Sequence, residues 1–116
     1  MYFAVEAVFP LQGFIRLIAA GRTSAEITAE RSTEAIQAEV LTGAYQYEIW
    51  GMMDADNELF VEFVEEVFVR EGVPACELPE DRLDAARGMI AELVARWSGL
   101  GPGETMELSL PARPEA

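Results

Sequence analysis

Two segments with helical apolar periodicity constrain the fold of this chain more than any other feature. In residues 56–71 apolar side chains recur at steps of three and four, Asp54 or Asp56 can cap the start, and Gly72 can end the helix. Residues 80–97 repeat the pattern. We therefore predict two amphipathic helices. Their apolar positions are Leu59, Phe60, Phe63, Val64, Val67 and Phe68 in the first, and Leu83, Ala86, Ile90, Leu93, Val94 and Trp97 in the second.

Alternation of apolar with other residues predicts β-strands elsewhere. Residues 2–9 have the sequence YFAVEAVF, with Glu6 as the only charge, and end at Pro10, which favours a strand covered on most of both faces. Residues 35–52 hold two alternating runs around Thr42-Gly43, the pattern of a hairpin. The Ala, Gln and Glu content of the first run equally supports a helix. Residues 105–110 alternate as a half-buried final strand.

Residues 11–40 are ambiguous. Apolar residues between positions 11 and 18 keep helical spacing, Pro10 fits a first helical turn and Gly21 can end the helix. Thr23 and Glu26 form the pattern of a capping box. A strand over residues 14–19 is an open alternative, but we favour a helix.

These elements together predict an α+β fold. A small mixed or antiparallel sheet of about three to four strands, including the hairpin near 35–52, would pack against the helices at 56–71 and 80–97. The length of 116 residues suits one domain. We expect residues 1–110 to form a single acidic domain and residues 111–116 a flexible C-terminal tail.

The charge of the chain predicts its kind of partner. The sequence has 21 acidic and 8 basic residues, for a formal net charge of −13; every basic residue is arginine. Such a field repels nucleic-acid phosphates and anionic membranes and attracts basic surfaces. We expect a partner protein with a basic surface, no direct nucleic-acid binding and no membrane association. A homodimer is an open alternative.

Missing residue types exclude several chemistries. Without histidine there is no imidazole base and no Ser-His-Asp triad, and without lysine there is no Walker A loop and no Schiff base. Cys76 is the only cysteine, so a structural zinc site or an iron–sulfur cluster is excluded. The acidic run 54–58 resembles the start of an EF-hand loop, but Leu59 occupies its glycine position and helix capping explains the run. We expect no enzyme activity, catalytic residue, metal or cofactor.

The same features predict a cytoplasmic address. One cysteine cannot form an intramolecular disulfide, the first residues lack a basic region, and no apolar run approaches the ~18 residues of a membrane span.

The segment Leu17 to Val40, LIAAGRTSAEITAERSTEAIQAEV, resembles the helix-turn-helix of LuxR-type regulators at Gly21, Thr23, Glu26 and Ile27. That resemblance covers about a fifth of the chain and implies two helices that meet DNA. The chain departs from the family in two ways. Its turn is about two residues short, and its second helix carries Glu34 and Glu39 with no basic residue, which is the wrong charge for phosphate contacts. We therefore interpret the match as a local coincidence.

A charged stripe on the 56–71 helix is the predicted binding site. Four glutamates share one narrow face at about 100° per residue; they are Glu58, Glu62, Glu65 and Glu66. A solvated helix face is the simpler interpretation of the stripe. The functional hypothesis is a non-enzymatic module that occupies a basic surface of its partner, and a nucleic-acid-binding surface is one such candidate. Nucleic-acid mimics, bacterial immunity proteins and phage anti-defence proteins such as anti-CRISPRs are analogues in size and charge.

Two alternatives stay open. One is an acidic chaperone or a structural subunit of a larger complex, which would bind through an apolar surface while its charge gives solubility. The other is a domain that binds a small ligand or a divalent metal through carboxylates.

Overall fold

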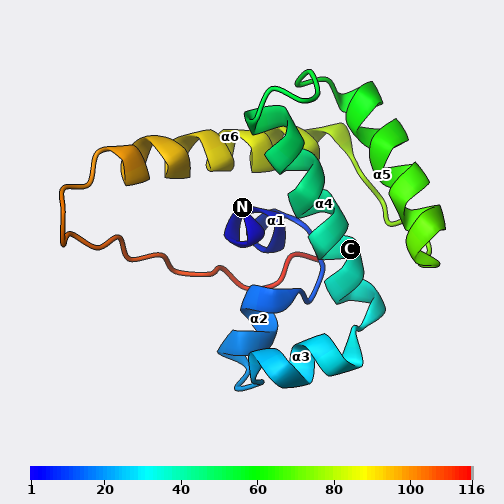
Figure 1. Cartoon of the computed structure of the whole chain (residues 1–116), viewed down its shortest axis with the longest axis horizontal. Coiled ribbons are helices and arrows are strands. Elements are labelled where there is room, and N and C mark those ends of the chain that lie inside the picture. The colour runs from blue at the N-terminus through cyan, green and yellow to red at the C-terminus, as the bar shows by residue number, and fades with distance from the viewer. Residues whose placement is uncertain (116) are drawn as a thin grey trace.

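A computed structural model describes residues 1–115 and contains, within them, six α-helices and no β-strand (Figure 1). The predicted α+β fold with a small sheet is therefore wrong, whereas the two C-terminal helices are confirmed. The helices are α1 (Tyr2–Val8), α2 (Phe14–Ala19), α3 (Ser24–Glu30), α4 (Thr33–Ile49), α5 (Asn57–Glu71) and α6 (Glu80–Ser98).

Helices α1 and α4 form the centre of the fold. Helix α1 packs against α2, α4 and α6, and α4 also packs against α5, so that the short N-terminal helix lies in the middle of the molecule (Figure 1). The largest side chains with almost no exposed surface come from three helices and the segment after α1. They are Phe9, Leu41, Tyr45, Phe60, Phe68 and Leu83.

The predicted strand over residues 2–9 is wrong because α1 is a buried helix with no polar face. Ala4, Val5, Glu6 and Ala7 are all buried in α1. A helix covered on all sides shows no period of 3.6 residues, and a short apolar run cannot then be distinguished from a buried strand by pattern alone.

The predicted hairpin near residues 35–52 is wrong for a related reason. Those residues lie mainly in α4, and Gly43 occupies the middle of that helix. Buried residues of α4 fall on more than one face because α1 and α5 cover different sides of it. The helix begins at Ser32, whose side chain accepts a hydrogen bond from the Ala35 N–H.

The predicted final strand over residues 105–110 is also wrong, because this segment has no partner strand among residues 1–115. Met106 and Leu108 face an apolar hollow beneath α6 instead. An unpaired extended chain with one covered side gives the same alternation as a strand.

The helical interpretation is confirmed for residues 14–19, although the helix begins after Gly13 and not at Pro10, and the capping box is confirmed. Thr23 Oγ1 accepts from the Glu26 N–H, and the Glu26 carboxylate accepts from the Thr23 N–H, both at 3.1 Å. Helix α3 then turns into α4 at Arg31 and Ser32. The segment that resembles a helix-turn-helix is therefore helical, while Glu39 on its second helix is exposed.

A buried carboxylate joins α1 to α2. Glu6 has no exposed surface, and its two oxygens accept hydrogen bonds from the Ile15 and Arg16 N–H groups at 2.9 and 2.8 Å. These donors belong to the first turn of α2, where N–H groups lack intrahelical partners. Gly13 allows the approach, since a Cβ at this position would lie 2.7 Å from Glu6 Cδ and 2.8 Å from Ala38 Cβ.

The C-terminal helices begin and end where the sequence predicts. Asp56 caps α5 by accepting from the Leu59 N–H, and Gly72 ends it in the left-handed conformation. In α6, Leu83, Ala86 and Ile90 are buried as expected. Val94 and Trp97 are exposed, so the prediction that they belong to the core is wrong.

The segment after α6 returns along the molecule, and hydrogen bonds from three arginines connect it to the rest of the chain. Arg16 donates to the Pro111 carbonyl at 2.9 Å, and Arg82 donates to the Glu115 carbonyl at 2.6 Å. Arg113 donates to the Pro10 carbonyl at 2.8 Å and to the Glu34 carboxylate. Ala116, the last residue of the predicted tail, lies outside the described residues. Among the described helices, none is long and apolar enough to cross a membrane.

Candidate functional site

The acidic stripe lies along the outer surface of α5. All four glutamates are exposed, while Phe60, Val64 and Phe68 on the opposite side of the helix are buried. Figure 1 shows α5 at the edge of the molecule, beyond α4. The structure therefore brings Glu58, Glu62, Glu65 and Glu66 together on one accessible face.

None of the four stripe glutamates forms an ion pair among residues 1–115, although exposed Arg70 lies one helical turn after Glu66 on α5. The arginines that form ion pairs do so with other carboxylates: Arg22 with Glu26 and Glu30, Arg31 with Glu71, Arg87 with Glu48 and Asp84, and Arg113 with Glu34. Neighbouring like charges one helical turn apart disfavour the helix. The stripe is thus a concentrated negative surface whose four carboxylates form no ion pair within the described residues.

A shallow hollow extends the acidic stripe at the start of α5. It has a volume of about 440 Å³ and lies between α5, the loop before α6 and the first turn of α6. Glu58, Glu62 and Glu80 contribute carboxylates, while Val61, Leu78 and Leu83 contribute apolar surface. Such a surface matches arginine or lysine side chains, which carry an apolar stem and a charged end.

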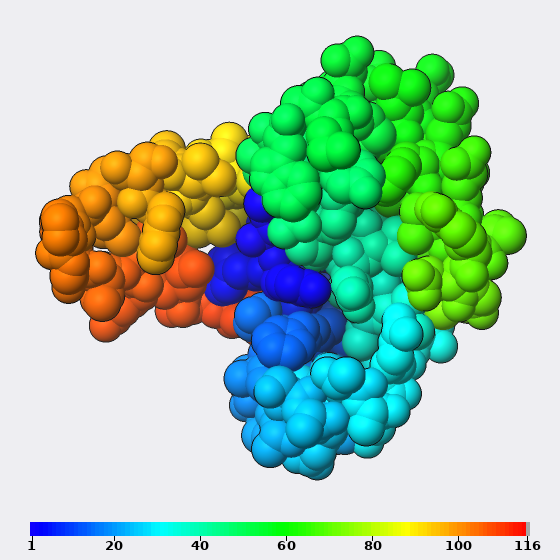
Figure 2. Space-filling view, viewed as in Figure 1, coloured from blue at the N-terminus to red at the C-terminus, as the bar shows by residue number. Residues whose placement is uncertain are grey.

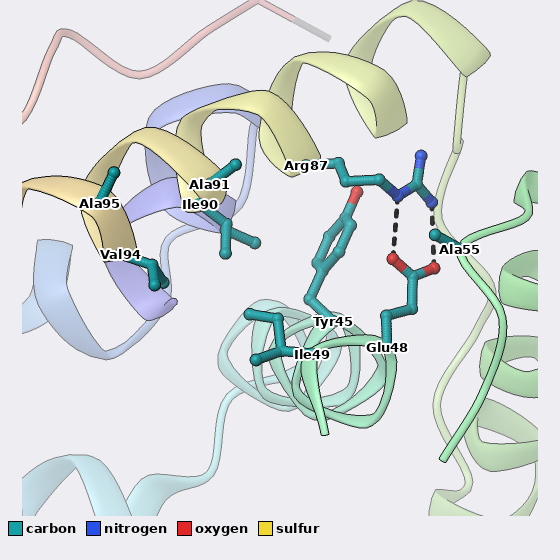
Figure 3. A pocket seen from close by; sticks show the side chains of 9 residues that line it. All are labelled: Tyr45, Glu48, Ile49, Ala55, Arg87, Ile90, Ala91, Val94 and Ala95. Atoms are coloured by element: carbon teal, nitrogen blue, oxygen red, sulfur yellow. Dashed lines mark hydrogen bonds and ion pairs between the residues drawn. The ribbon is translucent and has the colours of Figure 1, made fainter. Parts of the chain in front are cut away.

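A second, mostly apolar groove lies between the end of α4 and α6. Its volume is about 400 Å³, and Figure 3 shows Tyr45 and Ile49 of α4 facing Ile90 and Val94 of α6 across it. Ala91 and Ala95 complete the α6 wall. Large apolar side chains near this groove are exposed to solvent, which marks it as a second surface able to contact a partner.

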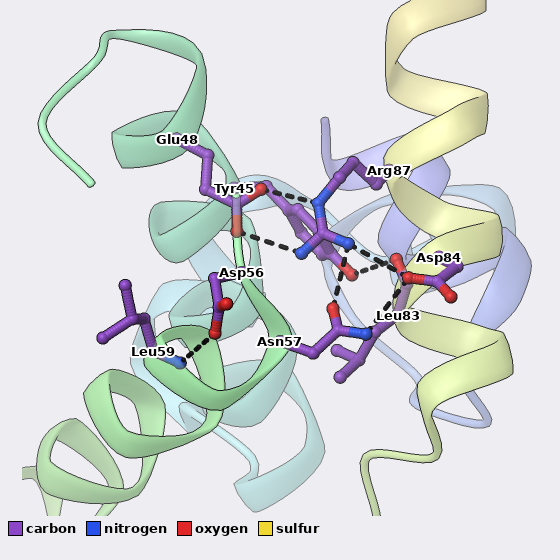
Figure 4. Close-up of polar contacts among 8 residues, drawn as sticks. All are labelled: Tyr45, Glu48, Asp56, Asn57, Leu59, Leu83, Asp84 and Arg87. Carbon is purple, nitrogen blue, oxygen red and sulfur yellow. Dashed lines mark hydrogen bonds and ion pairs between the residues drawn. The ribbon is translucent and has the colours of Figure 1, made fainter. Parts of the chain in front are cut away.

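A polar cluster closes one end of this groove (Figure 4). Arg87 donates to both oxygens of Glu48, at 2.9 and 3.0 Å, and to Asn57 Oδ1 at 2.9 Å. The Tyr45 hydroxyl donates to the Leu83 carbonyl at 2.9 Å. Hydrogen bonding to Glu48 raises the pKa of Arg87, and burial raises the pKa of Tyr45. The cluster ties α4, α5 and α6 together.

Groups that could do chemistry are otherwise sparse. Burial raises the pKa of the Cys76 thiol to about 11, so it is a weak nucleophile at neutral pH. Within residues 1–115 no three Asp, Glu or Cys side chains are grouped as metal ligands would be. Asp56, from the acidic run that resembles an EF-hand, is used as the cap of α5.

Two parts of these surfaces do not follow from the sequence pattern. Glu80 joins the acidic stripe only because the loop from Gly72 to Pro79 folds back along α5. Val94 and Trp97 continue the apolar face of α6, and in sequence that continuation is indistinguishable from core. The apolar face of α6 extends beyond the part of the helix that is buried. Only the structure shows where the buried part ends, so the sequence alone does not identify Val94 and Trp97 as surface residues.

Comparison with known proteins adds no relative: no family model, curated protein or solved structure matches this chain.

Proposed function

We propose that this chain is a non-enzymatic, acidic protein-binding module that occupies a basic surface of a partner protein. The observation that carries the proposal is the α5 stripe, in which four exposed glutamates have no cation within ion-pair distance among the described residues. An attached partner would supply the missing cations.

The mechanism is competitive. Glutamate carboxylates pair with arginine or lysine groups that otherwise hold phosphates or acidic segments, and the hollow beside Glu58, Glu62 and Glu80 receives the stem of one such side chain. The net charge of −13 accelerates the encounter at low ionic strength. Added salt should weaken the complex because it screens the exposed carboxylates.

Affinity capture with a charge-matched pair of variants tests the proposal. The test variant replaces the stripe with glutamine, E58Q/E62Q/E65Q/E66Q. The control variant removes as many charges from exposed glutamates elsewhere: E39Q/E77Q/E107Q/E115Q. Quantitative mass spectrometry should find proteins that the native chain and the control retain and that the stripe variant loses.

Binding measurements with the purified proteins then test the mechanism. For a protein identified in this way, we expect the stripe variant to weaken binding by about tenfold or more, and raised salt to weaken native binding. Equal capture by the two variants would contradict the assignment to α5, and binding unaffected by salt would contradict the charge mechanism.

A further inference from the structure

The chain that follows α6 folds back over the molecule and forms a strap, residues 104–115. Figures 1 and 2 show the strap, coloured orange to red, returning beneath α6 toward the N-terminal helices. Met106 and Leu108 of the strap line a hollow of about 240 Å³, and Phe3 of α1 and Leu93 of α6 line it from the other segments. The strap therefore covers part of an apolar surface.

Three arginines attach the strap to separate places on the fold. Arg16 of α2 and Arg82 of α6 each donate a hydrogen bond to a strap carbonyl, at 2.9 and 2.6 Å. In the other direction, Arg113 of the strap donates to the Pro10 carbonyl and to the Glu34 carboxylate of α4. The chain has only 8 basic residues, and three of them serve this one segment.

The core of the protein is complete without the strap. The buried apolar cluster and the side chains packed against it end at Leu93. No residue from 102 to 115 is buried, and within residues 1–115 the strap makes one backbone–backbone hydrogen bond, from the Glu104 N–H to the Gly101 carbonyl. The strap can therefore separate from the surface without opening the core or breaking a helix.

A glycine-rich turn joins the strap to α6. Helix α6 ends at Ser98, and residues 99–103 have the sequence GLGPG. Gly103 adopts the left-handed conformation, with φ at 81°. Because glycine has access to many backbone conformations, this turn can act as a hinge while α6 keeps its place.

We propose that residues 104–115 are a releasable strap, which opens as one unit about the 99–103 turn while the six helices stay folded. A segment that buries little surface and is held by exposed polar contacts opens at a smaller free energy than the core. Opening separates Met106 and Leu108 from Phe3 and Leu93. The strap thus controls access to the apolar surface beneath α6.

The attachments depend on one another because they hold the same short segment. Each closed contact keeps the others at a high effective concentration, so the loss of one weakens the rest. The strap should therefore be released along its whole length when a few contacts are removed, including the part near Met106 that no arginine touches.

Backbone ¹⁵N relaxation of the full chain tests the strap. In the native chain we expect the heteronuclear NOE of the strap N–H groups to be close to that of the helices. The variant R82A/R113A should lower the NOE over all of residues 104–110 together. The control R70A/R96A removes as many charges from exposed arginines of α5 and α6, and it should leave the strap unchanged.

Two further measurements examine the apolar surface. Fluorescence of the neutral dye Nile red should rise by about twofold or more in R82A/R113A relative to the native chain and the control, because apolar side chains become exposed. The variant L108S keeps every arginine and removes an apolar contact of the strap. It should give the same loss of NOE and the same rise in dye fluorescence.

Circular dichroism separates release of the strap from unfolding, and the helix content should be equal in all four proteins. A native strap with NOE values near zero would overturn the closed state. Loss of helix together with strap release would show that the strap belongs to the folded core. An unchanged NOE in R82A/R113A, or an equal change in the control, would show that the arginine contacts do not hold it.

Discussion

Glu6 illustrates how a single buried charge can hold two helices together. Its carboxylate replaces water at the two N–H groups that begin α2, and each oxygen has its own donor. Burial raises the pKa of Glu6, while the hydrogen bonds from Arg16 and Ile15 oppose that rise. The residue is therefore a structural cap whose charge is costly but whose two acceptors are needed.

Replacing Glu6 with glutamine separates acceptor number from charge. Glutamine offers one acceptor oxygen and one N–H₂ donor, so one N–H of α2 loses its partner. We expect E6Q to lose about 1–3 kcal/mol of unfolding free energy in urea titrations near neutral pH. Equal or greater stability of E6Q would mean that desolvation outweighs the lost hydrogen bond.

The raised pKa of Glu6 determines in which direction its contribution to stability changes with pH. Because the folded-state pKa of Glu6 is raised, the folded chain binds a proton more readily than the unfolded chain does, and this contribution is lost as pH rises through the folded pKa. The stability of the native chain relative to E6Q should therefore increase as pH falls from neutrality toward 4.5, the ordinary pKa of a glutamate. A difference that shrinks on acidification would contradict a raised pKa.

At the scale of the elements, two glycines in helical surroundings have opposite roles. Gly13 faces Glu6 and Ala38 at distances too short for a Cβ, whereas nothing lies within 4 Å of a Cβ added at Gly43 in α4. We expect Gly13→Ala to lose about 1–3 kcal/mol through overpacking and Gly43→Ala to gain about 0.5–1 kcal/mol through helix propensity. Thermal unfolding of both variants checks the pair, and a stabilised Gly13→Ala would show that the junction can relax.

The same elements explain what the sequence could and could not predict. Both α5 and α6 follow from a clear apolar face, because solvent covers one side of each helix, and the boundaries of α5 also follow from its caps at Asp56 and Gly72. Helices α1 and α4 lie between other helices, so burial removes the polar face that would reveal their period. The alternation around Thr42-Gly43 reflects that two-sided burial and only imitates a hairpin.

The Arg87 cluster is the main polar connection between elements. It joins the end of α4 to the start of α5 and to α6, and the Glu48 side chain is only 5% exposed. We expect Arg87→Ala to lose about 2–4 kcal/mol, because it leaves a buried carboxylate uncompensated. Arg96→Ala, an exposed position on the same helix, should change stability little. Urea titrations compare the two, and equal losses would contradict a special role for the cluster.

At the scale of the whole molecule, the candidate site was partly predictable. The four stripe glutamates follow from helical geometry alone, since α5 is strongly amphipathic. The contribution of Glu80 depends on the path of the Gly72–Pro79 loop, and the exposure of Val94 and Trp97 depends on where the core ends beneath α6. Both are properties of the tertiary arrangement, which local periodicity does not encode.

The stripe should also carry a measurable cost in stability. Glu62 lies one turn from both Glu58 and Glu66, and such pairs each oppose the helix by about 0.2–0.5 kcal/mol at low salt. We expect E58Q/E62Q/E65Q/E66Q to raise Tm by about 3–6 °C at low ionic strength, and less at high salt. Calorimetry at two salt concentrations provides the measurement.

The charge-matched control E39Q/E77Q/E107Q/E115Q separates local from global repulsion, because it removes the same number of charges from other exposed sites. A larger gain for the stripe variant would show that the α5 glutamates themselves strain the fold. That result would favour a binding role, since a solvated face has no reason to concentrate unpaired charge on one helix. Equal gains would assign the cost to net charge alone. A lower Tm for the stripe variant would mean that these glutamates stabilise the fold, and the argument for a partner would lose its basis.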